Sequence, residues 1–366
     1  MNPQDLLYSR LAGRFAEGNL PASLLLTGPR GIGKWNVAFE LAMRITCLTP
    51  QQDRGCGECA SCKQLEQFAH PDIQFLFPLP SNEADWPDWL FPYLHGKRQN
   101  PFAVSAADPK HFVPIEAIRR FQSVLARRST LSPYKVGIIY EAERMLPGTM
   151  DSLLKLLEEP PDKCFLIVVT PEPRFLLSTI VSRLQRVNVP LLSDEFVSQY
   201  MQNQYSLRDE QLTAMVRFAR GQLFDINTIM QGDFMQMRQA AFDMISLALS
   251  HTQTEIHLRA GESAWLSTRE KVEALLRHWQ SIIRDLLICG TGDAATESND
   301  TSTRLINYDY QPQYAELSRQ IGNIDRIEAL SDRIEAIRQE LRRNVNPRMA
   351  ALSFLFHLSP QSARVG

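Results

Sequence analysis

The chain has 366 residues, which is enough for two or three domains with cores of their own. Its hydrophobic content of 44%, charged content of 22% and net charge of −2 exclude a disordered chain and a globally basic nucleic-acid binder. The first residues lack a signal-peptide profile, and no run of about 18 apolar residues predicts a membrane span. Six cysteines are too few for a disulfide scaffold of this length, so we expect a cytoplasmic protein with no membrane partner.

The N-terminal half alternates between helical and strand patterns. Apolar periodicity and turn residues predict helices over 5–17, 35–47, 115–128 and 149–159, and strands over 24–26, 70–77, 135–140 and 164–170. Strands that alternate with helices imply a mostly parallel sheet covered on both faces. We therefore predict an α/β core over residues 1–190.

An irregular stretch over residues 78–114 interrupts this alternation. It is rich in proline and aromatic residues, then polar, and we interpret it as a long surface insertion. Its aromatic residues could form a patch that binds a partner, but packing onto their own domain is the favoured alternative.

Beyond Pro190 the pattern is almost entirely helical, with Gly221 and Gly232 as interruptions. We predict a small helical domain over 191–233 and a helical C-terminal domain over 234–366. The polar stretch 290–303 is typical of an exposed, disordered loop. His278 lies among these helices without a partner motif, so we expect it to be solvated or to cap a helix.

A glycine-rich loop follows the first strand. Gly28, Gly33 and Lys34 fit the pattern G-x-x-x-x-G-K-[ST], in which backbone N–H groups cradle phosphate and the lysine reaches the outer phosphates. The last position departs from the pattern, because Trp35 has no hydroxyl to hold Mg²⁺. The loop therefore indicates a nucleotide-binding architecture with one part missing.

Four cysteines lie close together in the segment 47–62. Cys47, Cys56, Cys59 and Cys62 are spaced x8, x2 and x2, which is typical of a tetrahedral structural Zn²⁺ site. His70 is a substitute ligand to consider, although four cysteines already close the shell. An iron–sulfur cluster and four unrelated thiols are the less favoured alternatives.

Several of these motifs together resemble the AAA+ ATPases of sliding-clamp loaders. The resemblance covers the loop 28–35, the strand end 138–143, the stretch 170–173 and the stretch 179–183, in this order and spacing. Residues 153–161 are close to the family's L-L-K-x-L-E-E-P-P, residues 179–183 to its T-I-x-S-R-C, and residues 344–348 to a stretch late in its C-terminal domain. The four cysteines match the zinc module inserted in bacterial members.

The resemblance implies an architecture and a set of partners. It implies an AAA+ core with an inserted zinc module, a helical lid over 191–233, and a helical collar over 234–366 that joins the subunits in a heteropentameric ring. Such a ring, part of the DNA polymerase III holoenzyme, uses ATP to load the sliding clamp onto primer–template DNA. The partners expected for this chain are therefore other clamp-loader subunits, with the clamp and DNA reached through the complex.

The resemblance also implies what the loop has lost. In an active member the strand end presents an aspartate to Mg²⁺, and this chain has Tyr140 there, which is a poor metal ligand. Because Trp35 and Tyr140 both stand where the family has a metal-binding residue, we expect no Mg²⁺ site and no intrinsic ATPase. Glu141 or Glu143 could ligate metal in a shifted register. Weak nucleotide binding and an empty loop kept for packing remain open alternatives. The candidate contacts for a nucleotide are Gly28, Gly31, Gly33, Lys34, Glu141 and Thr170.

Arg183 is the residue that we expect to carry function, with no catalytic residue in cis. The resemblance implies an arginine finger that stabilises the γ-phosphate bound by a neighbouring subunit. The alternative is an arginine that pairs with a carboxylate, and the family's next cysteine is replaced here by Leu184. Two rival functions are a competent ATPase, such as a clamp-loader motor subunit or another AAA+ remodeller, and a zinc-dependent nucleic-acid module, which the net charge disfavours.

Overall fold

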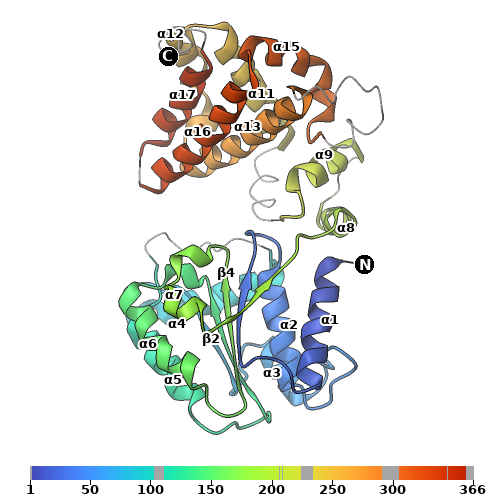
Figure 1. Cartoon of the computed structure of the whole chain (residues 1–366), viewed down its shortest axis with the longest axis vertical. Helices are drawn as coiled ribbons and strands as arrows, with labels where there is room; N and C mark the ends of the chain where they lie inside the picture. The colour runs from blue at the N-terminus through green and yellow to red at the C-terminus, as the bar shows by residue number, and fades with distance from the viewer. Residues whose placement is uncertain are drawn as a thin grey trace. The chain divides into compact units, whose positions relative to one another are not determined.

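A computed structural model describes residues 2–102, 111–205, 207, 209–223, 234–290, 305–343 and 345–359. The chain divides into two compact units, one formed by 1–199 with 220–225 and the other by 200–219 with 226–366 (Figure 1). The separate small domain over 191–233 stays a prediction.

The first unit is built on a five-stranded parallel sheet in the order β2-β3-β4-β1-β5. Its strands are β1 (Ser23–Thr27), β2 (Ile73–Leu76), β3 (Lys135–Tyr140), β4 (Cys164–Thr170) and β5 (Gln185–Asn188). The predicted parallel sheet is confirmed, but β5 has no counterpart in the sequence prediction. The reason is that β5 lies at the edge of the sheet and is mostly polar and exposed, so it shows no apolar run.

Helices cover both faces of this sheet (Figure 1). On one side lie α1 (Pro3–Ala16), α2 (Lys34–Thr46) and α3 (Ala60–Glu66), and on the other lie α5 (Ile115–Leu125), α6 (Pro147–Glu158) and the short α7 (Ser178–Val181). The alternation of side chains along β1 divides the core between the two layers, because Leu24 and Leu26 join the cluster around α2 while Leu25 joins the cluster around α5 and α6. The predicted α/β core is therefore confirmed.

The sequence indicated that the insertion is irregular, and in its described residues, 78–102 and 111–114, this prediction is wrong; residues 103–110 lie outside the described residues. It contains a 3-10 turn at Glu83–Asp85 and then a helix, α4 (Trp86–Gln99). Pro87 lies in the first turn, where its missing N–H has no partner to lose, while Pro92 lies inside the helix at the cost of one backbone hydrogen bond. Burial of Trp86 and Leu94 confirms that the insertion packs onto its own domain.

The second unit is all helical in its described residues, as predicted. Its helices are α9 (Asp209–Ala219), α11 (Phe234–Ser250), α12 (Gln253–Ala260), α13 (Arg269–Gly290), α15 (Gln311–Ile321), α16 (Ile324–Arg342) and α17 (Pro347–Leu358), while α8 (Asp194–Gln204) runs across the boundary of the units. Short 3-10 turns lie at Ala264–Leu266 and Tyr308–Tyr310. Its core includes Trp279, which stacks on Phe354 with 4.7 Å between ring centroids.

One prediction about this unit is wrong, and another falls almost entirely outside the described residues. His278 is neither solvated nor a cap, because it is buried and stacks on Phe218 with 4.4 Å between ring centroids. The predicted exposed loop over 290–303 lies, apart from Gly290 at the end of α13, outside the described residues. Among the helices that the structure describes, none is both long enough and apolar enough to cross a membrane.

Candidate functional site

The glycine-rich loop lies between β1 and α2, where its backbone needs glycine. Gly28, Gly31 and Gly33 have φ of 140°, 72° and 84°, a region that other residues rarely adopt. A Cβ at Gly28 would lie 2.9 Å from the carbonyl oxygen of Val189, so the turn is also sterically closed to larger residues. Gly33 is the N-cap of α2, and the loop therefore ends at a helix N-terminus.

Lys34 is buried and folded back onto this loop. Its Nζ donates to the carbonyl oxygens of Gly28 at 2.8 Å and Pro29 at 2.5 Å. Burial lowers the pKa of Lys34 to about 7, while the carboxylate of Glu143 acts in the opposite direction. The Lys34 ammonium thus has two hydrogen-bond acceptors within its own loop.

The two positions at which the family pattern has metal ligands are in contact with each other. The Trp35 ring packs against the Tyr140 ring at 5.5 Å between centroids and 83° between planes, within a cluster that includes Phe75 and Phe77. Burial raises the pKa of Tyr140, so its phenol stays neutral. Trp35 has no oxygen to offer Mg²⁺, and a neutral phenol such as that of Tyr140 is a poor ligand for it.

The nearby carboxylates are held by intrachain partners. Glu141, at φ 54°, pairs with Arg144 at 3.2 Å between Oε2 and Nε. Glu143 accepts a hydrogen bond from the Thr170 hydroxyl at 2.8 Å and lies 3.7 Å from Arg30 Nη2. Burial, followed by the charge of Glu141, raises the pKa of Glu143. A shifted register in which either carboxylate binds metal would have to break these contacts.

The structure brings most of the predicted nucleotide contacts together. Gly31, Gly33, Lys34 and Glu141 line one pocket. Gly28 lies next to this pocket as a partner of Lys34, and Thr170 does so as a partner of Glu143. Contact of these residues with a nucleotide stays a prediction.

Two residues at or beside this pocket were not identified from the sequence. Lys97 donates to the Tyr140 hydroxyl at 3.3 Å between Nζ and oxygen, and Phe102 lines the pocket with Gly33. Both belong to the insertion, and local sequence patterns do not predict how the insertion packs. The only available signal was the position of Lys97 in the polar stretch that follows the aromatic residues of the insertion.

Arg183 lies just after α7 and makes two intrachain contacts. Its Nη2 pairs with Glu158 Oε1 at 2.6 Å, and its Nη1 donates to the Thr179 carbonyl oxygen at 2.6 Å. The side chain is 35% exposed and that of Glu158 is 48% exposed. In the isolated chain Arg183 is therefore paired with a carboxylate, as the alternative proposed. Its role as an arginine finger toward a neighbouring subunit stays a prediction.

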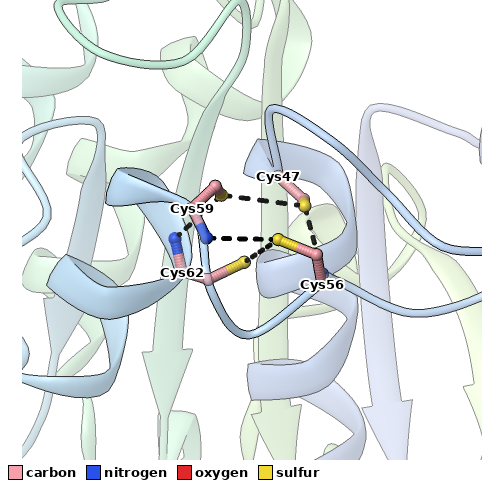
Figure 2. A group of neighbouring side chains, drawn as sticks. All are labelled: Cys47, Cys56, Cys59 and Cys62. Atoms are coloured by element: carbon pink, nitrogen blue, oxygen red, sulfur yellow. Dashed lines mark hydrogen bonds between the residues drawn. The ribbon is translucent and has the colours of Figure 1, made fainter.

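The four cysteines converge as the spacing predicted. Cys47 follows α2, Cys56 lies in the connecting loop, and Cys59 and Cys62 lie at the start of α3 (Figure 2). Their Sγ atoms all lie within 4.8 Å of one another, so the group could hold a metal ion. The Thr49 hydroxyl and the backbone N–H groups of Cys59 and Glu58 lower the pKa of Cys56 to about 6, which favours the thiolate.

His70 is not a fifth member of this group. Its Nε2 lies 2.8 Å from the Ser61 hydroxyl, and its Nδ1 accepts a hydrogen bond from the backbone N–H of Asp72 at 3.0 Å. Both ring nitrogens are therefore engaged away from the sulfurs. The substitute-ligand alternative is not supported.

Comparison with known proteins identifies the family of the chain. Residues 3–193, more than half of the chain, match the family model described as DNA polymerase III, delta subunit. The DNA polymerase III subunit delta' of Escherichia coli is 24% identical over 74% of this chain and 75% of its own length. The subunits delta' of Haemophilus influenzae and Pseudomonas aeruginosa are 24% and 30% identical over 64% and 51% of this chain.

The extent of these matches differs between relatives. The chain spans 62% of the Haemophilus protein and 48% of the Pseudomonas protein, less than two thirds of either. The family model covers the α/β unit that contains the loop, the cysteine group and Arg183. The chain belongs to the DNA polymerase III delta' family of clamp-loader subunits.

Proposed function

We propose that this chain is a non-catalytic clamp-loader subunit that hydrolyses no ATP itself and completes the ATP site of a neighbouring subunit with Arg183. The observation that carries the proposal is the contact between Trp35 and Tyr140. Phosphoryl transfer needs Mg²⁺ to bridge the phosphates and neutralise developing charge. An aromatic pair at both metal positions removes that part, while the described carboxylates nearby are paired with cations or hydroxyls.

The finger proposal is compatible with the contacts of Arg183. Its pair with Glu158 is partly exposed, and such pairs contribute about 0–1 kcal/mol. A finger in place can accelerate hydrolysis by roughly 10³-fold or more, equivalent to about 4 kcal/mol. The stabilisation that a finger gives to the transition state therefore exceeds the loss of the Glu158 pair on these magnitudes. The proposed setting is a heteropentameric ring that loads a sliding clamp onto primed DNA.

We also propose that the cysteine group holds a structural Zn²⁺. Four sulfurs at about 2.3 Å from a tetrahedral centre are separated by about 3.8 Å. The Cys47–Cys59 and Cys56–Cys62 sulfur pairs are separated by 3.9 and 4.0 Å. The shell would be complete with four protein ligands, so the ion would hold the 47–62 segment together and leave no position for a substrate.

The first test is hydrolysis by the isolated chain. We expect no turnover above that of a Lys34→Ala variant at saturating Mg·ATP. Turnover that Lys34→Ala abolishes would contradict the non-catalytic proposal and favour a motor subunit.

The second test uses a reconstituted clamp loader with the sliding clamp and primed DNA. We expect Arg183→Ala to lower ATP turnover by about threefold or more while the complex assembles normally, because only one site loses its finger. Arg120→Ala is a matched control, since Arg120 is an exposed arginine of the same unit that pairs with Glu83. Equal turnover in the two variants would contradict the finger assignment.

A further inference from the structure

The insertion contacts the degenerate nucleotide site at three points within the first unit. From α4, the Tyr93 hydroxyl donates to Glu141 Oε1 at 3.3 Å and Lys97 Nζ donates to the Tyr140 hydroxyl at 3.3 Å. After α4, Phe102 lies against Gly33 of the loop. One segment, 86–102, therefore reaches both a metal position and the phosphate loop through its C-terminal half.

Lys97 places a cation beside the position of a missing metal ligand. Its side chain is almost wholly buried, and Nζ lies 4.8 Å from the centroid of the Tyr140 ring and 5.8 Å from that of Tyr93. An ammonium over an aromatic face is stabilised by the ring quadrupole, and more so where water is excluded. A divalent ion in the same place would be repelled by this resident charge.

Phe102 covers the phosphate loop. A Cβ on Gly33 would lie 2.8 Å from Cε1 of the Phe102 ring, which shows how closely the ring approaches the loop backbone. Phe102 and the preceding Pro101 line the same pocket as Arg30 and Lys34. The N–H groups at the start of a helix are the usual contacts of a phosphate, and an apolar ring packed there competes with it.

We infer that the segment 86–102 is a built-in occupant of the degenerate nucleotide site, with Lys97 in place of the divalent cation and Phe102 over the loop, so that ATP and ADP are excluded. This inference rests on the proposed loss of hydrolysis and assigns a role to the insertion. The site is complete without a ligand, because its cations and carboxylates already have partners from the same chain.

The test is nucleotide binding by the full chain with a fluorescent ADP and Mg²⁺. We expect no saturable binding to the wild type up to the highest concentration tested, and saturable binding by the Lys97→Met, Phe102→Ala double variant with a Kd at least tenfold below that concentration. Phe91→Ala is the control, because Phe91 is a largely exposed aromatic residue of the same helix. It should behave as the wild type does.

Each remaining outcome counts for or against the inference. Wild-type binding as tight as that of the folded double variant, or no binding by either, would overturn it. If the double variant does not fold, the wild type alone decides, since a rise in its Tm on adding Mg·ADP contradicts exclusion and an unchanged Tm supports it. Hydrolysis is measured in the same samples. Turnover by the wild type contradicts the proposed function. Turnover that appears only in the double variant supports the inference that segment 86–102 occupies the site, and contradicts only the proposed loss of metal ligands.

Discussion

Lys34 is buried with its ammonium against two carbonyl oxygens, and this has a consequence for stability. Its pKa in the folded chain is about 7, below the ordinary 10.5, because burial disfavours the charged form. Between these two values the unfolded chain holds a proton that the folded chain does not. The free energy of unfolding therefore rises with pH across this window. The contribution of Lys34 to that free energy is lowest below pH 7.

We predict that Lys34→Met removes this pH dependence. The stability of the wild type relative to Lys34→Met should rise by on the order of 2 kcal/mol between pH 7 and pH 9. Urea unfolding followed by tryptophan fluorescence measures the two proteins at each pH, and the difference cancels the titration of other groups. A difference that does not change with pH would mean that Lys34 titrates near its ordinary pKa.

Residues inside a motif were easier to predict than residues that complete a site. Trp35 and Tyr140 stood out in the sequence because the motifs specify what should be there. Their contact, and the arrival of Lys97 and Phe102, depend on how the insertion packs, and no local pattern encodes that. The sequence therefore predicted what the site lacks better than what takes its place.

At the level of elements, α5 packs on β3 through a glycine. A Cβ on Gly137 would lie 2.5 Å from Cζ of Phe121 and 2.8 Å from Cδ1 of Leu125, both buried. We predict that Gly137→Ala destabilises the first unit by about 1–3 kcal/mol through overpacking. Chemical denaturation measures this loss.

The control for this prediction is Gly148→Ala. Gly148 lies in the first turn of α6, and a Cβ at this position would meet no neighbouring group within 4 Å. Alanine should therefore leave stability unchanged or raise it slightly. Equal effects at the two positions would show that the α5–β3 contact is not as tight as described.

The segment between α2 and α3 depends on the cysteine group. Cys59 caps α3 by accepting a hydrogen bond from the N–H of Cys62, and the two other cysteines lie opposite (Figure 2). We predict about one zinc per chain, lost in Cys59→Ser, together with faster proteolysis near residues 47–62 because one of four ligands is removed. Metal analysis and limited proteolysis test this, with Cys164→Ser as a control outside the group. A zinc content unaffected by Cys59→Ser would contradict the four-ligand assignment.

Elements with strong periodicity were predicted, and the missed ones are explained by composition. β3 and β4 have runs of buried apolar residues, and their bounds agree with the prediction. α4 was missed because its prolines are read as helix breakers, although one of them lies in the first turn, where proline is tolerated. β5 was missed because it is an edge strand, which pairs with a neighbouring strand on one side only. Its residues are mostly polar and exposed, so the sequence shows no apolar run there.

At the scale of the whole molecule, the α/β unit and the helical unit follow from the change of pattern after Pro190. The proposed finger acts on a site that another subunit supplies, so its effect belongs to the assembled complex. The family match supports that setting, but the partner of Arg183 within the chain is Glu158. The proposed finger would have to exchange Glu158 for a neighbour's phosphate, and this exchange is the step to measure.

We predict that Glu158→Gln and Arg183→Ala act differently in the reconstituted clamp loader. Glu158→Gln removes a partly exposed ion pair worth about 0–1 kcal/mol, so ATP turnover should stay within about twofold of the wild type or rise slightly as Arg183 is freed. Arg183→Ala should lower turnover, and Arg183→Lys should restore little, since a point charge lacks the planar fork of a guanidinium. If Glu158→Gln lowers turnover as much as Arg183→Ala, the pair itself is what matters, and Arg183 has a structural role rather than the role of a finger.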